Sequence, residues 1–369
     1  MSQAGGFGGF GGFGGFGGFG GFGGFGGFGG FGSANFSGLG PFLGAGADPV
    51  YDTALVQGLQ ITEQSIAHVT QGLSDPVGKE APFSDAENLR FWADWVRSSV
   101  YLTDFMKDFD WEIHRPTESV TLKYGKGNFL ALKRPSPQTL KKQLGIMRQY
   151  LDQRPDRSAE TVSQLSFPTP YFAMILGLQT NHRYVFELIA VAQLLASHVA
   201  MVAKHHIACR RPVHVCANVM PMIPTPAHGS FPSAHAAEAY AVAEVMGCFV
   251  AAHRGHFADV ERRQALLSKL AERIAVTRTV AGMHFPIDSW AGALLGKAVG
   301  QIIAGKCGQD VQVESFTYDP GDGSDFFGSD FENRNELAKI GVKKKDSFKA
   351  RNSAEFSWLW KQAGKELVR

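Results

Sequence analysis

Apolar residues recur at three- and four-residue intervals through much of the chain, which is the spacing of helices with one buried face. This spacing predicts helices over residues 86–106, 137–152, 171–206, 236–253, 259–281 and 286–304, and another over residues 354–367. Strand signals are few, and only residues 119–132, around Gly125 and Gly127, predict a short hairpin. We therefore expect an all-α fold in which the helices form one or more bundles.

The three most apolar windows, residues 185–202, 236–252 and 287–304, are about as long as membrane spans. Each window contains charged side chains, such as Glu187 in the first and Asp288 in the third. Such groups are rare inside a bilayer, because hydrocarbon does not solvate them. We therefore expect buried helices and no transmembrane span.

The two ends of the chain differ in composition from its middle. From Gly5 to Phe31 the triplet Gly-Gly-Phe repeats nine times, and ordering so many glycines costs conformational entropy. We expect a disordered leader and linker over residues 1–48, a helical domain over 49–310, and a loosely ordered extension with a terminal helix over 311–369. The evenly spaced phenylalanines either support weak self-association or form a passive flexible leader.

Charge and cysteine content exclude several classes of protein. Thirty-six Lys and Arg residues against 34 Asp and Glu give a formal charge of +2, so no overall field recruits nucleic acid. Four cysteines among 369 residues are too few for a disulfide framework. The first residues carry neither the basic nor the apolar part of a secretory signal, so we expect a leaderless soluble protein, for instance a cytoplasmic one.

Nearly all the unusual polar residues fall in three short segments. The first contains Lys204 and, seven residues later, Arg211, which precedes Pro212 at the end of a long apolar helix. Because proline stops the helix, the two cations leave it together and are able to face one pocket. A solvated helix end is the alternative interpretation.

The second segment runs from His228 to His235 and precedes a helix. Ser233 is a good N-cap, so the backbone N–H groups of Ala234 and His235 point out of the helix N-terminus, where the dipole favours an anion. An oxyanion is therefore able to dock there. Taken alone, a capping serine beside a surface histidine is the simpler explanation.

The third segment contains Arg278, His284 and Asp288, with Pro286 in the first turn of a new helix. Asp288, four residues after His284, is able to reach one ring nitrogen, which fixes the tautomer and leaves the other nitrogen unprotonated. A histidine held in this way suits a nucleophile or a metal ligand. The alternative is a local helix cap made by the same two residues.

Together these segments resemble the signature of the superfamily that contains the type 2 phosphatidic acid phosphatases (PAP2) and the vanadium haloperoxidases. That signature reads K-x6-R-P, then P-S-G-H, then S-R-x5-H-x3-D. The corresponding residues here are Lys204-x6-Arg211-Pro212, Pro232-Ser233-Ala234-His235 and Thr277-Arg278-x5-His284-x3-Asp288. Two positions depart from the signature, since Ala234 replaces a glycine and Thr277 replaces a serine.

The resemblance implies a helical bundle around a site for vanadate, in which phosphate is also able to bind. The ion would be held by three cations and two further donors, which are Lys204, Arg211, Arg278, Ser233 and the N–H of Ala234. His284 would bond directly to the central atom and serve as the vanadate ligand, Asp288 would orient it, and His235 would act as acid or base from the opposite side.

Two activities are implied by this family. In a haloperoxidase, hydrogen peroxide oxidises a halide with help from His235 and Lys204, whereas in a phosphatase His284 attacks a phosphomonoester to give a phosphohistidine. His228, five residues before Ser233, stands where the bromide-oxidising members of the family carry a histidine and the chloride-oxidising members an aromatic residue. We therefore expect a vanadium-dependent haloperoxidase acting on bromide or iodide, with a soluble acid phosphatase as the alternative.

Two further alternatives come from other classes of protein. A zinc site would use residues whose spacing matches no standard zinc pattern, namely His205, His206, Cys209, His214 and Cys216. A non-enzymatic scaffold would work through the Gly-Gly-Phe leader and would not depend on His284. For each of the enzymatic functions we expect a homo-oligomer.

Overall fold

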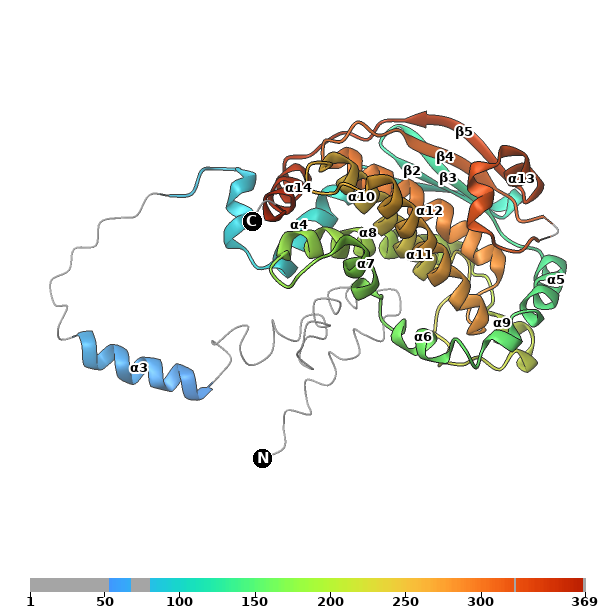
Figure 1. Ribbon diagram of the computed structural model, residues 1–369, viewed down its shortest axis with the longest axis horizontal. Coiled ribbons are helices and arrows are strands. Elements are labelled where there is room, and N and C mark those ends of the chain that lie inside the picture. Colours follow the sequence, from blue (N-terminus) through green and yellow to red (C-terminus); the bar gives the residue numbers. More distant parts are fainter. Residues whose placement is uncertain (1–52, 68–79, 322, 368–369) are drawn as a thin grey trace.

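The computed structural model describes residues 53–67, 80–321 and 323–367 (Figure 1). The predicted disordered leader, residues 1–48, lies outside these described residues. The α-helices are α3 (Thr53–Ala67), α4 (Asp94–Met106), α5 (Pro137–Arg148), α6 (Ser158–Ser163), α7 (Thr169–Leu176), α8 (Arg183–Ile207), α9 (Pro212–Val215), α10 (Ala234–Ala252), α11 (Val260–Val280), α12 (Pro286–Lys306), α13 (Arg334–Lys339) and α14 (Ala354–Glu366). Short 3-10 helices are η3 (Ala86–Phe91), η4 (Arg115–Thr117), η5 (Leu151–Gln153), η6 (Ala217–Val219) and η7 (Gly328–Glu332).

The helical part of the prediction is confirmed, with two long helices divided and the one expected over residues 137–152 ending at Arg148, before η5. The helix expected over residues 86–106 is split into η3 and α4. The helix expected over residues 171–206 is split into α7 and α8 at Gly177, whose φ of 68° ends α7 in the left-handed conformation that glycine adopts easily. The helices predicted over residues 236–253, 259–281 and 286–304 are α10, α11 and α12.

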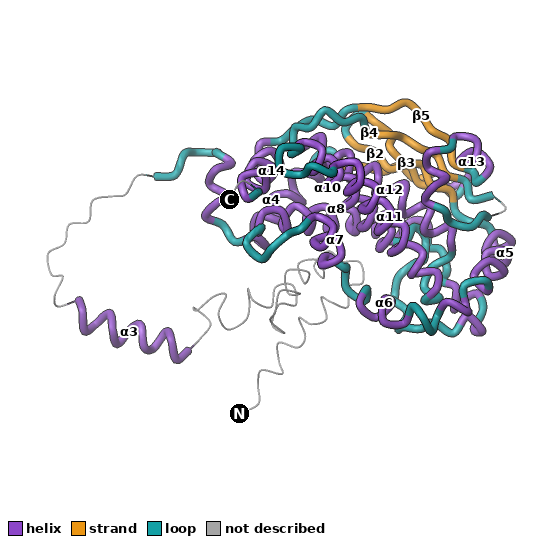
Figure 2. Tube along the Cα trace, in the orientation of Figure 1, coloured by secondary structure: helices purple, strands orange, loops and turns teal. Residues whose placement is uncertain are grey.

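A five-stranded sheet corrects the expectation of an all-α fold. Its strands are β1 (Phe109–His114), β2 (Ser119–Tyr124), β3 (Gly127–Lys133), β4 (Val313–Tyr318) and β5 (Val342–Phe348), in that spatial order. The predicted hairpin is β2 with β3, and β3 continues to a parallel pairing with β4, Leu130 opposite Phe316. Figure 2 shows the sheet along one side of the helices, and α8 and α12 contact it.

The chain beyond residue 310 differs from the loosely ordered extension that its composition predicts. It contains β4, α13, β5 and the predicted terminal helix, α14. Helix α14 packs on α8, and its Glu366 carboxylate accepts hydrogen bonds from the N–H groups of Tyr184 and Val185 at the start of α8. Backbone pairing and a buried helix face, rather than composition, therefore order this segment.

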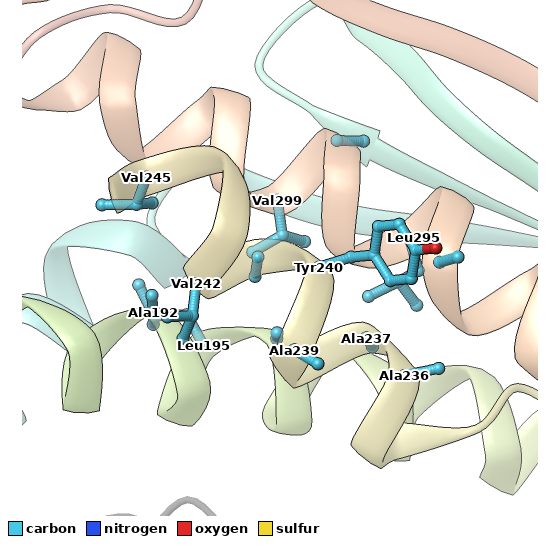
Figure 3. Close-up of a cluster of buried hydrophobic side chains, with 14 of the residues drawn as sticks. Ala192, Leu195, Ala236, Ala237, Ala239, Tyr240, Val242, Val245, Leu295 and Val299 are labelled. Carbon is cyan, nitrogen blue, oxygen red and sulfur yellow. The ribbon is translucent and has the colours of Figure 1, made fainter. Parts of the chain in front are cut away.

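The core is built around α10, which lies between α8 and α12. Figure 3 shows Ala192 and Leu195 of α8 on one side of α10, and Leu295 and Val299 of α12 on another. Helices α10 and α12 approach closely because glycines line the contact: a Cβ on Gly296 would lie 2.8 Å from the carbonyl carbon of Ala237. This contact fixes the relative position of the two helix starts.

Within the described residues, one helical stretch, Arg183–Val215, is long and apolar enough to cross a membrane. Its best window has a mean hydropathy of 1.9, and 83% of that window is buried by the rest of the fold. Such burial is that of a core helix, which is the role expected for this segment.

Candidate active site

The three segments singled out in the sequence meet where four helix ends come together. Lys204 lies in the last turn of α8, Arg278 in the last turn of α11, and Asp288 in the first turn of α12. Ser233 caps the start of α10, and its backbone N–H donates to the carbonyl oxygen of Asp288 at 2.8 Å. The polar ends of separate helices thus surround one region of the interior.

Lys204 is 2% exposed, and its ammonium group is held by the main chain of the second segment. Nζ donates to the carbonyl oxygens of Gly229 at 2.7 Å and Ser230 at 2.8 Å. Burial, together with the charge of Arg211, lowers the pKa of Lys204 well below its usual value. A nearby anion would counteract both effects and favour the charged amine.

Arg211 joins the first segment to the other two. Its Nε donates to the carbonyl oxygen of His228 at 3.0 Å, and its Nη2 lies 3.2 Å from Nδ1 of the same residue. Its Nη1 donates to the carbonyl oxygen of Met283 at 3.1 Å and lies 3.3 Å from Nε2 of His284. Burial lowers the pKa of Arg211 to about 10, so the guanidinium is still charged at neutral pH.

His284 and Asp288 form the pair that their spacing predicts. Nδ1 of His284 lies 3.0 Å from Oδ2 of Asp288, and that oxygen also accepts hydrogen bonds from the N–H of Phe285 at 3.0 Å and from the Ser230 hydroxyl. Burial lowers the pKa of His284 well below its usual value and raises that of Asp288 to about 6. The imidazole is therefore neutral, with its proton on Nδ1 and its lone pair on Nε2, beside Arg211.

Arg278 and His235 share a partner on the other side of the site. The carbonyl oxygen of Gln164 accepts from Nη1 of Arg278 at 3.1 Å and lies 3.2 Å from Nε2 of His235. Burial lowers the pKa of Arg278 to about 10 and, with the charge of Arg278, lowers that of His235 to about 3. His235 is therefore a neutral base at physiological pH.

Positive charge is in excess within this buried region. Lys204, Arg211 and Arg278, which we call the cationic cluster, are each 2% exposed. Nε of Arg278 is buried and has no hydrogen-bond partner within the part of the chain that the structure describes. Buried cations and an unsatisfied donor suit an anion with several oxygens, so the residues present fit vanadate or phosphate.

The start of α10 is arranged as the sequence predicts. The hydroxyl of Ser233 accepts a hydrogen bond from the N–H of Ala236 at 3.4 Å, which makes Ser233 the N-cap. The N–H of Ala234, in the first turn, belongs to the donors that a helix cannot satisfy internally. Their part in binding an anion stays a prediction.

Two residues of the site were missed in the sequence. Ser230 donates to Asp288 and lies 3.4 Å from Nδ1 of His284, and its position two residues after His228 was a usable signal. Gln164 follows the short helix α6, and no motif or spacing pointed to it.

The zinc alternative has no geometric support. Across residues 53–67, 80–321 and 323–367, no group of three or more His, Cys, Asp or Glu side chains is arranged to hold a metal ion. The rings of His205 and His206 touch each other, with centroids 4.8 Å apart, and that of His206 also packs near Trp111.

Comparison with known proteins finds one family match, and it covers the part of the chain that carries these residues. Residues 184–306 match the model of the PAP2 superfamily, and the matched segment includes every site residue predicted from the sequence. A search of the curated proteins found no match. The chain therefore carries a PAP2 superfamily domain, built from helices α8 to α12.

Proposed function

We propose that this protein is a vanadium-dependent haloperoxidase that oxidises bromide or iodide with hydrogen peroxide. The PAP2 superfamily contains both haloperoxidases and phosphatases, so the domain alone does not decide between them. The observation that carries the choice is the contact of His228 with Arg211, 3.2 Å between Nδ1 and Nη2. This contact puts the histidine expected of bromide-oxidising members beside the cationic cluster.

The cationic cluster would hold the oxygens of vanadate, with the N–H of Ala234 as a further donor. The lone pair on Nε2 of His284 would make the bond to vanadium, because Asp288 holds the proton on the opposite nitrogen. Bound vanadate supplies Lewis acidity that activates hydrogen peroxide toward a halide.

The residues around the ion supply orientation and proton transfer. His235 holds its proton at Nε2, against the Gln164 carbonyl, so that Nδ1 is the basic nitrogen that takes a proton from peroxide. Lys204 is fixed by two carbonyl oxygens and would present its remaining N–H to the ligand.

The phosphatase alternative is supported by the same lone pair. Nε2 of His284 is an unprotonated nucleophile 3.3 Å from Arg211, and the cationic cluster would stabilise charge on a transferred phosphoryl group. The negative charge of a bound phosphomonoester would oppose the cations that lower the pKa of His235, so that a protonated His235 would donate a proton to the leaving oxygen.

Two assays of the purified protein test this function. The first measures oxidation of bromide, iodide or chloride by hydrogen peroxide, with and without orthovanadate. The second measures hydrolysis of p-nitrophenyl phosphate. We expect halide oxidation that requires vanadate. His228→Ala is expected to lower bromide turnover about tenfold, because a group beside the oxyanion site is lost. The control is His205, an exposed histidine in the last turn of α8, and His205→Ala is expected to retain full turnover.

Hydrolysis of the phosphomonoester without any halide oxidation would replace this proposal with the phosphatase. Unchanged turnover in His284→Ala would discard both, since each activity needs the same imidazole.

A further inference from the structure

Gln164 lies against two of the proposed site residues, although it is outside the segment that matches the PAP2 model. Its side chain is fully buried, and its main-chain carbonyl oxygen is shared by Arg278 and His235. Its amide oxygen also accepts from Nη2 of Arg278 at 2.9 Å. We propose that Gln164 is a positioning residue of the oxyanion site, which orients Arg278 and fixes the tautomer of His235; this inference rests on the proposed function.

The first effect concerns the guanidinium of Arg278. Each terminal nitrogen donates one N–H to the same residue, Nη1 to the main-chain oxygen and Nη2 to the side-chain oxygen of Gln164. Because the guanidinium group is rigid and planar, these two bonds also set the direction of its Nε–H. The guanidinium nitrogen without a hydrogen-bond partner within the described residues is the buried Nε. Gln164 thereby turns one donor of Arg278 toward the anion.

The second effect concerns the imidazole of His235. A carbonyl oxygen accepts hydrogen bonds and never donates them, so neutral His235 carries its proton on Nε2, the atom 3.2 Å from Gln164. The lone pair is then on Nδ1. The same carbonyl therefore aligns a cation and a base.

The orientation of the Gln164 amide is itself determined by its neighbours. Its Nε2 donates to Oε1 of Glu160 at 3.3 Å, and the Glu160 carboxylate is held by Arg273 at 2.8 Å. A carboxylate accepts only, so the NH₂ of Gln164 faces Glu160 and its oxygen faces Arg278. This chain of contacts extends from the surface, through α6, to the site.

Binding of inorganic phosphate and of orthovanadate to the full-length protein, measured by calorimetry, tests the inference. Gln164→Leu removes the acceptor for Nη2 and is expected to raise both dissociation constants about tenfold. Gln164→Glu pairs Arg278 with a carboxylate and is expected to weaken binding at least as much. The control is Ser166→Glu, which adds the same charge at an exposed position of the same segment and should change binding less than twofold.

A double-mutant cycle separates positioning from a general loss of structure. In an Arg278→Lys background, Gln164→Leu is expected to have little further effect on anion binding, since the bond from Nη2 of Arg278 that it removes no longer exists. Thermal unfolding of each variant is recorded beside binding. If Gln164 only stabilises the fold, the two substitutions should raise the dissociation constant by independent factors that multiply, and each increase should parallel the loss of thermal stability.

The outcomes separate this inference from the proposed function. Wild-type binding together with unchanged binding in Gln164→Leu would overturn the role of the Gln164 side chain and leave the proposed function standing. No binding of either anion by the wild type would overturn the oxyanion site and this inference with it. Multiplying effects in the cycle would also reject the positioning role.

Discussion

Glu238 lies one helical turn after His235 on α10, and neither proposed activity uses it. Its side chain is 2% exposed, and it is hydrogen-bonded to Ser197. Burial raises the pKa of Glu238 to about 8, against the opposing effects of Ser197 and of the charges on Lys204 and Arg278. The group is therefore protonated at neutral pH and leaves the excess positive charge of the site uncompensated.

Glu238→Gln is expected to remove part of the pH dependence of stability. Between the unfolded pKa, near 4.3, and about 8, folded Glu238 keeps a proton that the unfolded state has lost, so this one group lowers the stability of the wild type by about 1.4 kcal/mol per unit of rising pH. The stability of the glutamine variant relative to the wild type should thus increase from pH 5 to pH 8, as measured by urea unfolding. A difference that does not change with pH would show that Glu238 is ionised in the folded state.

Individual site residues were predictable from the sequence when local spacing set their geometry. Asp288 and His284 are four residues apart across a helix start, and the structure places their side chains 3.0 Å apart. Gln164 was not predictable, because it reaches Arg278 from 114 residues away and its position depends on how α6 packs on α11.

At the scale of elements, the site depends on the contact between α10 and α12. Gly292, Gly296 and Gly300 recur every four residues along α12, where they face α10. A Cβ on Gly300 would lie 2.8 Å from the carbonyl oxygen of Ala241, and one on Gly292 would lie 2.9 Å from the Cβ of Ala236. Main-chain atoms therefore set the distance between these helices.

Gly296→Ala is expected to destabilise the protein by about 1–3 kcal/mol, because the new methyl group meets main-chain atoms that cannot move aside. The matched control is Gly247→Ala in the interior of α10, where the nearest atom is a side-chain carbon of Gln264 at 3.8 Å. That change should be neutral or stabilising by about 0.5–1 kcal/mol, since alanine favours helix. Equal free energies of unfolding for the two variants would contradict the close contact.

A helix could be predicted from the sequence where its buried residues recur at a regular period along one face. Helices α10, α11 and α12 were located in this way to within two residues at each end. Strands β1 and β5 were missed because four or more consecutive residues in each are exposed or only partly buried, so no alternation marks them. Their pairing with distant strands, not their own pattern, makes them part of a sheet.

At the scale of the whole molecule, the cationic cluster gathers charge from three separate parts of the chain. Lys204 belongs to α8, Arg211 precedes α9, and Arg278 belongs to α11. Without an anion these charges repel one another in a poorly screened interior. A bound oxyanion would bridge them and link the elements that carry them.

Phosphate is therefore expected to stabilise the folded protein against heat. At a free concentration one hundred times its dissociation constant, the gain is about 2.7 kcal/mol. Differential scanning fluorimetry with phosphate measures this gain as a shift in the unfolding temperature. Sodium chloride at equal ionic strength is the control. Arg278→Ala should lose the phosphate effect, whereas Arg254→Ala, which removes an exposed cation, should keep it. Equal shifts with both salts would point to general screening.

The glycine contact between α10 and α12 has a consequence for redesign of this protein. Ser233 and Asp288 lie at the starts of α10 and α12, whose separation is set by main-chain contact, so we expect changes to apolar side chains elsewhere in the interior to leave their distance unaltered. His228 and Gln164 come from connecting segments outside these two helices. New oxyanion chemistry is therefore best introduced through those connecting segments, while the two helices are left untouched.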